Sequence, residues 1–139
     1  VGFHFSVDIQ IPGANQNDIR FQEVSGISAD IEMESVKSGG ENRFTFKLPK
    51  RTSYPELVLK RGLLIDTGIM SWCRDAIEQF DIQPATVIVK LLDEAHQPLQ
   101  TYNFVNAYPK KWSLSSFNAQ ENSLVVETLE LAYQYFNIV

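Results

Sequence analysis

The opening stretch of the chain, from Phe3 to Ile11, places an apolar side chain at every odd position. Phe3, Phe5, Val7, Ile9 and Ile11 are apolar, whereas the residues between them are polar. Successive side chains of a strand point to opposite faces, so this stretch predicts a long strand with one dry and one wet face. A small protein built from such strands has many backbone edges where copies of itself can join, which directs attention to assembly.

The same pattern returns in residues 27–36 and 44–48, with a hairpin between them. Ile27, Ala29, Ile31 and Met33 fall on one face of the first segment. The sequence Lys-Ser-Gly-Gly-Glu-Asn at 37–42 is the clearest hairpin tip in the chain. We expect residues 49–55, which begin and end with proline, to be irregular.

One segment changes to a helical period. Its apolar residues are spaced i, i+3, i+4, i+7, i+8 and i+11: Ile69, Trp72, Cys73, Ala76, Ile77 and Phe80. This spacing predicts one buried stripe on a helix over about 67–80. Either Asp66 or Thr67 can cap its start.

The rest of the chain again predicts strands. Short strands are expected at 19–24 and 57–61, and a turn at Ser25-Gly26 where the glycine is free to take a positive φ. Later strands are expected at 85–92, 100–108, 112–117 and 124–133. About nine strands and one helix in one domain, 1–139, predict a mainly β fold of two packed antiparallel sheets, a sandwich or barrel with one flanking helix.

Composition narrows the classes of function. The net charge of −5 argues against the nucleic-acid backbone and anionic membranes as main partners, so we expect no specific nucleic-acid site. The single cysteine, Cys73, excludes an internal disulfide, and two histidines give no convincing metal set. No apolar run reaches the length that crosses a bilayer, so no membrane anchor is expected. The chain begins at Val1, so preceding residues can be missing.

No set of residues predicts catalysis or a cofactor. Asp93-Glu-Ala-His96 matches a helicase tag, but the chain lacks the phosphate-binding loop those enzymes need, so a polar turn is expected. Cys73 lies on the apolar stripe and is expected to be inert. Glu127 falls on the apolar face of its strand, so either a bulge turns it outward or a basic residue meets it.

The order of several segments resembles the tail tube proteins of contractile phage tails and extracellular contractile injection systems. The segments are Phe21-Gln-Glu-Val-Ser-Gly-Ile27, Leu57-Val-Leu-Lys-Arg-Gly62, the helix with Trp72, Val89-Lys-Leu-Leu-Asp-Glu94, Phe104-Val-Asn-Ala-Tyr-Pro109, and Val125-Val-Glu-Thr-Leu-Glu-Leu-Ala132. They cover nearly the whole chain. The loop at 12–18 looks longer than in the family, which leaves open a tube-initiating paralogue at the baseplate.

The resemblance implies a structural subunit and not an enzyme. Family members form hexameric rings that stack into a hollow tube inside a contractile sheath, and the tube is driven through a target envelope and conducts cargo. Sheath and baseplate proteins would then be partners, with assembly in the bacterial cytoplasm. The family's inter-ring hairpin corresponds to Glu34, Ser35, Val36, Lys37, Ser38, Gly39, Gly40, Glu41, Asn42 and Arg43. The acidic row Asp30, Glu32 and Glu34 is a candidate lining of the lumen.

Two rival classes share the strand pattern. A small-ligand-binding β-barrel would use aromatic residues such as Tyr102, Tyr108 and Trp112 around an internal cavity. An enzyme on a β scaffold would need a perturbed acid or nucleophile in a cleft, and the sequence offers no convergent set.

Overall fold

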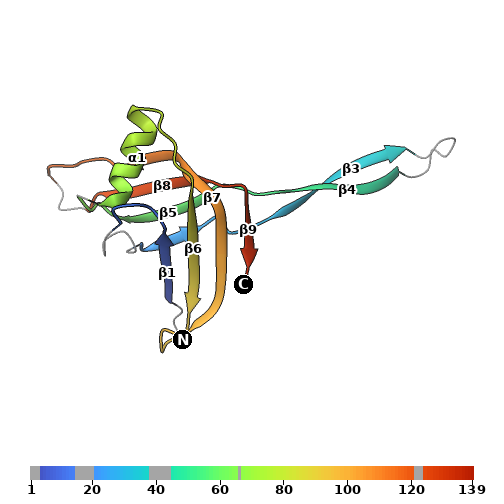
Figure 1. The fold of residues 1–139 in the computed structure, drawn as a ribbon, viewed down its shortest axis with the longest axis horizontal. Coiled ribbons are helices and arrows are strands. Elements are labelled where there is room, and N and C mark those ends of the chain that lie inside the picture. Colours follow the sequence, from blue (N-terminus) through green and yellow to red (C-terminus); the bar gives the residue numbers. More distant parts are fainter. Residues whose placement is uncertain (1–3, 15–20, 38–44, 66, 121–123) are drawn as a thin grey trace.

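The computed structural model describes residues 4–14, 21–37, 45–65, 67–120 and 124–139. Within them the chain forms nine strands and one helix (Figure 1). In chain order these are β1 (His4–Ile9), β2 (Glu23–Ser25), β3 (Asp30–Lys37), β4 (Thr45–Ser53), β5 (Leu57–Gly62), α1 (Gly68–Glu78), β6 (Ala85–Leu92), β7 (Pro98–Leu114), β8 (Val126–Ala132) and β9 (Tyr135–Ile138). The predicted mainly β fold with one flanking helix is confirmed.

Seven strands form one bent antiparallel sheet, which together with α1 we call the body. The strand order is β1-β6-β7-β8-β5-β2, with β9 also paired to β7. β7 pairs with β6 and β9 along its first part and with β8 along its last part. The sheet therefore folds into two layers that share β7, a sandwich-like arrangement and not a closed barrel.

The long strand β7 corrects a sequence prediction. Pro109 was expected to divide this region into two strands, yet β7 continues for 17 residues. Asn106 takes a φ of 53°, and the pairing of β7 with β8 shifts between Pro109 and Lys111. A proline fits a strand at a bulge, where a ladder hydrogen bond is missing anyway. The proline therefore marks the bend at which β7 passes between layers.

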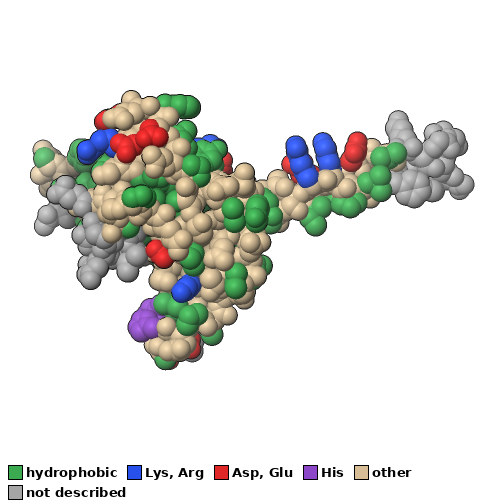
Figure 2. Space-filling view, in the orientation of Figure 1, with side chains coloured by type: hydrophobic (Ala, Val, Ile, Leu, Met, Phe, Trp, Pro, Cys, Tyr) green, Lys and Arg blue, Asp and Glu red, His purple; other side chains and the backbone are tan. Residues whose placement is uncertain are grey.

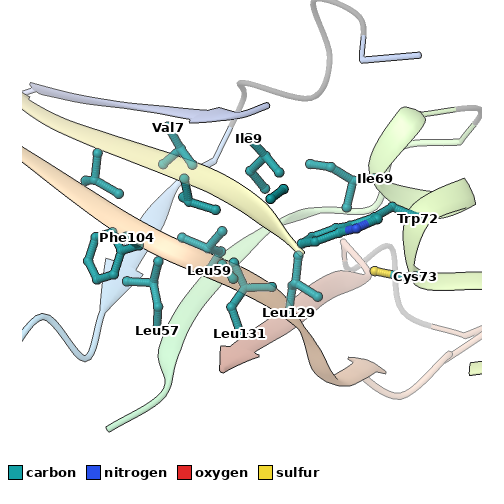
Figure 3. Close-up of a cluster of buried hydrophobic side chains, with 14 residues drawn as sticks. Val7, Ile9, Leu57, Leu59, Ile69, Trp72, Cys73, Phe104, Leu129 and Leu131 are labelled. Carbon is teal, nitrogen blue, oxygen red and sulfur yellow. The ribbon is translucent and has the colours of Figure 1, made fainter. Parts of the chain in front are cut away.

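The core lies between the two layers and α1 (Figure 3). Val7, Val87 and Phe104 come from one layer, and Leu59 and Leu131 from the other; none exceeds 1% exposure. The alternation predicted for the first strand is confirmed in β1, where Val7 and Ile9 are buried. Each such side chain contributes about 1.5–3 kcal/mol by leaving water.

The helix is confirmed with shorter bounds than expected. Thr67 is the N-cap, and its hydroxyl accepts a hydrogen bond from the Met70 amide at 3.1 Å. Gly68 lies against the chain at Gly13, because a Cβ there would meet the Gly13 carbonyl oxygen at 2.6 Å. Ile69, Trp72, Cys73 and Ala76 are buried as predicted.

Two members of the predicted buried stripe are exposed. Ile77 is 61% exposed and Phe80 is 82% exposed, so the interpretation of Phe80 as a core residue was wrong. The helix ends at Glu78, and Phe80 follows with a φ of 51°, outside the helical period. The period of 3.6 residues therefore stops holding at the point where the backbone reverses.

β3 and β4 form a separate two-stranded sheet that projects from the body, and we call this hairpin the arm (Figure 1). Residues 49–55 were expected to be irregular, but β4 runs through Pro49 to Ser53. The pairing shifts between Glu32 and Met33, opposite Pro49 and Arg51, so Lys50 is an extra residue on β4. This bulge accommodates the proline within a strand.

Other boundaries differ by a few residues. The second strand, expected at 19–24, is β2 at 23–25, and the turn glycine Gly26 has the predicted positive φ, 89°. The final strand, expected at 124–133, is β8 at 126–132, and β9 at 135–138 was not predicted. The predicted hairpin tip and the loop at 15–18 lie outside the described residues.

Candidate assembly surface

The arm is the most exposed regular structure in the chain. Its strands pair only with each other within the described residues, from Asp30 opposite Ser53 to Lys37 opposite Thr45. Eight strand residues span about 26 Å, so the arm reaches well beyond the body. A lone two-stranded hairpin is marginally stable in water, so a surface of this kind is suited to contact another molecule.

The arm exposes large apolar side chains. Ile31, Met33 and Leu48 are 63%, 53% and 50% exposed. The predicted dry face of residues 27–33 is therefore exposed from Ala29 to Met33, whereas Ile27 packs against the core. In Figure 2 hydrophobic side chains lie along the lower side of the arm and charged ones along its upper side. Leu48 is paired with Glu34, so it shares the face of the acidic row, whereas Ile31 and Met33 lie on the other face of β3.

The acidic row lies on the arm. Asp30, Glu32 and Glu34 share the even-numbered face of β3. Arg51 Nε donates to Glu32 Oε2 at 2.8 Å, which lowers the pKa of Glu32 and raises that of Arg51. The row is thus partly neutralised by its neighbour strand. Of the predicted inter-ring residues, 34–37 belong to β3 and 38–43 lie outside the described residues.

Sheet edges that have no partner strand among the described residues form a second surface for assembly. β1 and β2 stand at the two ends of the sheet order. Polar side chains cover the outer face near β2, where Lys60 lies 4.0 Å from Glu23, and Lys111 of β7 lies 4.0 Å from Glu130 of β8. Open edges expose backbone groups that another chain can pair with.

Aromatic rings connect the arm to the body. Tyr54, directly after β4, has its ring centroid 5.4 Å from Phe136 and 5.9 Å from Tyr133. Tyr133 in turn meets Phe104 edge-on at 4.9 Å. Burial raises the pKa of Tyr133 to about 12. The root of the arm is therefore packed on core residues, which fixes where the arm leaves the body.

A buried ion pair resolves the alternatives left open for Glu127. Arg61 Nε donates to Glu127 Oε2 at 3.2 Å, and both side chains are 2% exposed. Trp112 Nε1 donates to the other carboxylate oxygen at 3.0 Å. A basic residue therefore meets Glu127. The partner was not found from sequence, because it lies 66 residues away.

The ion pair also contacts the N-cap of the helix and the segment before β2. Arg61 Nη2 donates to Thr67 Oγ1 at 3.5 Å, and its guanidinium lies 4.6 Å from the Phe21 ring centroid. Breaking a buried pair of this kind leaves an uncompensated charge, which is strongly destabilising. These hydrogen bonds therefore link β5, β7, β8 and the start of α1.

The residues considered for chemistry have structural surroundings. Asp93 Oδ1 accepts hydrogen bonds from the amides of Ala95 and Gln97, as expected for a polar turn. Cys73 is 1% exposed, and burial, followed by the charge of Glu127, raises the pKa of its thiol to about 12. The His4 and His96 rings lie 4.9 Å apart and are tilted by 37°, but no group of three or more potential metal ligands occurs among the described residues. No helix in the described ranges has the length and apolar character to cross a membrane.

The fold and these surfaces are those of a mainly β structural subunit. It has a projecting arm, open sheet edges and a buried apolar core. The sequence profile of the family described as T4-like virus tail tube protein gp19 matches residues 1–137. The chain therefore belongs to this tail tube family, whose members are structural tube proteins. A search of curated sequences finds no match.

Solved structures agree with the family. A chain from the cryo-EM structure of the anti-feeding prophage baseplate, 6-fold symmetrised, is 30% identical with a TM-score of 0.84, covering 99% of this chain and 91% of that one. A chain from the extended sheath-tube complex of the extracellular contractile injection system PVC is 23% identical, with a TM-score of 0.79 and coverages of 97% and 87%. Hcp1 from Flavobacterium johnsoniae shares the fold, with 14% identity, a TM-score of 0.59 and coverages of 96% and 93%.

Proposed function

We propose that six copies of this protein close into a ring and that the rings stack into the hollow inner tube of a contractile injection system. The family match over residues 1–137 carries the proposal. The number six is supported by the sixfold symmetry of the baseplate structure that contains a 30% identical chain. Open edges at β1 and β2 would join neighbouring subunits and satisfy their backbone groups.

The arm would connect one ring to the next. Residues 34–37, with the hairpin tip at 38–43, would make this contact, because an exposed two-stranded sheet needs a partner surface. Asp30, Glu32 and Glu34 would line the lumen and face water and cargo. Sheath and baseplate proteins of the same particle would surround the tube, which would assemble in the bacterial cytoplasm and be driven through a target envelope.

Deletion of residues 38–41 tests the role of the arm. We expect a folded subunit, by circular dichroism and thermal unfolding, that forms single rings but no long tubes in negative-stain electron microscopy. Asp30→Asn serves as the matched control, because it changes charge on the same arm outside residues 34–43 and should leave tubes intact. Long tubes from the deletion variant would contradict the assignment of the arm to ring stacking.

A second candidate is a tube subunit at the baseplate end. It is favoured by the 30% identity to a chain of a baseplate structure, against 23% to a chain of the sheath-tube complex. A baseplate-end subunit should stop at one or two rings when purified at micromolar concentration. A main tube subunit should instead elongate under the same conditions. The ligand-binding barrel is not supported, since the described strands do not close into a barrel.

A further inference from the structure

Phe80 is placed where the backbone favours a different residue. Three non-glycine residues of the described chain have a positive φ: Asn106, His96 and Phe80. Asn and His are enriched in this conformation, whereas a bulky aromatic residue is an outlier there. The amides of Gln79 and Asp81 both donate to the Asp75 carbonyl, closing α1 in a way that usually uses glycine after the helix.

Phe80 is also little buried by its own subunit. Its side chain is 82% exposed, and Ile77, one turn earlier on α1, is 61% exposed. We call these two residues the α1 knob. An exposed aromatic residue held in a strained conformation by a rigid helix end is a feature that the isolated subunit does not need.

A groove of about 240 Å³ lies beside α1 and includes Ile77 of the knob in its lining. It is lined by Met70, Cys73, Arg74, Ile77, Glu78 and Trp112. The buried carboxylate of Glu127 holds the indole nitrogen of Trp112, so one wall of the groove is fixed from inside the body. Arg74 and Glu78, both exposed, supply one positive and one negative charge at its rim.

The arm has the complementary surface. Its exposed Ile31 and Met33 share one face of β3 and suit an apolar groove, while Glu34, paired with Leu48, and Lys47, paired with Ser35, supply one negative and one positive charge. The arm and α1 lie at opposite ends of the subunit (Figure 1). A contact between two different surfaces at opposite ends is heterologous, so it propagates from copy to copy into rings or filaments.

We propose that the α1 knob and its groove are the docking site for the arm of a second copy of this chain. The proposal rests on the proposed tube function and adds to it the acceptor surface for the arm. Phe80 would pack against the apolar side of the arm, and the strain at its backbone would be offset by burial in the contact.

Phe80→Gly tests the proposal because it separates folding from assembly. Glycine suits the left-handed position, so the melting temperature of the monomer should stay unchanged or rise by about 3 °C. The protein concentration needed to form rings or tubes, measured by light scattering and electron microscopy, should rise at least about tenfold. Phe117→Gly is the matched control, since Phe117 is another exposed phenylalanine, 73% exposed, outside the groove.

Crosslinking gives a second readout that does not depend on complete tubes. Met33→Cys and Ile77→Cys variants, mixed under a mild oxidant, should form a disulfide-linked heterodimer, whereas Leu99→Cys should not pair with Met33→Cys. Native Cys73 is buried and should stay out of the reaction. The disulfide requires Cα atoms within about 7 Å, so it reports direct docking.

The outcomes distinguish the two proposals. Normal tubes from Phe80→Gly at the wild-type concentration, or no heterodimer, would overturn the docking site. Normal tubes that fail to recruit a sheath would overturn it too and assign the knob to the sheath protein. A wild-type chain that never forms rings would contradict the proposed tube function, and the crosslink would still decide whether the arm meets α1.

Discussion

The body and the arm are built from the same sequence pattern with opposite results. Both contain strands with alternating apolar residues, and both contain a glutamate–arginine pair. In the body Val7 and Leu59 are fully buried, and the Arg61 and Glu127 side chains are 2% exposed. In the arm Met33 is 53% exposed, and the Arg51 and Glu32 side chains are 71% and 38% exposed. Alternation thus specifies two faces of a strand but not whether the subunit itself covers the apolar one.

The largest effect is expected from breaking the buried ion pair of the body. Glu127→Ala leaves the Arg61 charge buried and removes the partner of Trp112, so the free energy of unfolding should fall by about 3–5 kcal/mol. Urea unfolding followed by fluorescence measures it. The double variant Arg61→Met with Glu127→Leu should lose much less than Glu127→Ala alone. An equal loss of stability in Glu127→Ala and in the double variant would show that the unpaired Arg61 charge is not the cause of the loss.

A matched pair of truncations compares the two regions directly. Leu59→Ala in the core should lower the free energy of unfolding of the monomer by about 2–5 kcal/mol, because it removes buried methyl groups and leaves a cavity. Met33→Ala in the arm should change it by less than about 0.5 kcal/mol and instead weaken assembly. A large loss of monomer stability in Met33→Ala would mean that the arm is part of the folding unit.

A smaller loss of stability is expected from removing the N-cap of α1 in the body. Thr67→Ala removes the hydroxyl that caps the Met70 amide and accepts from Arg61, so unfolding should become easier by about 1 kcal/mol. Thr67→Ser retains the hydroxyl and is the control. Loss of stability in both variants, measured by thermal unfolding, would point to the methyl group and not to the cap.

The smallest effect on stability is expected from the exposed Glu32–Arg51 pair of the arm. The folded-state pKa of Glu32 lies below its ordinary value of 4.5, because Arg51 donates to it. A lowered pKa stabilises the folded state above the ordinary value, and this contribution is lost as the pH falls through the lowered pKa. Because both groups are in water, only a slight, salt-sensitive loss below pH 4.5 is expected. Stability measured from neutral to acidic pH in Glu32→Gln should lack this component.

Most of the body could be predicted from sequence, because its strands follow period-2 patterns and its turns carry Gly, Pro or Asp. The exceptions have physical reasons. Pro109 and Pro49 lie at bulges, where a strand tolerates proline, so they did not end their strands. Arg61 and Glu127 meet across the sheet, and no local pattern reveals such a pair.

The candidate assembly surface was predicted only in part. The hairpin could be predicted from Gly39-Gly40 between two alternating segments. Its projection from the body could not be predicted from the sequence. Phe80 fitted the helical period and was assigned to the core, because a left-handed residue after a helix leaves no signal when it is not glycine. Sequence patterns predict the faces of a strand or helix. They do not predict which exposed face a second copy of the chain would cover.

The shared strand β7 has a mechanical consequence. Because its backbone belongs to both layers, the layers cannot shear past each other without rupturing the ladders that β6, β8 and β9 make with it. A load applied at one layer is transmitted to the other along covalent bonds. The two layers of the body are therefore joined by continuous backbone, whereas among the described residues the arm is joined to the body only at its root.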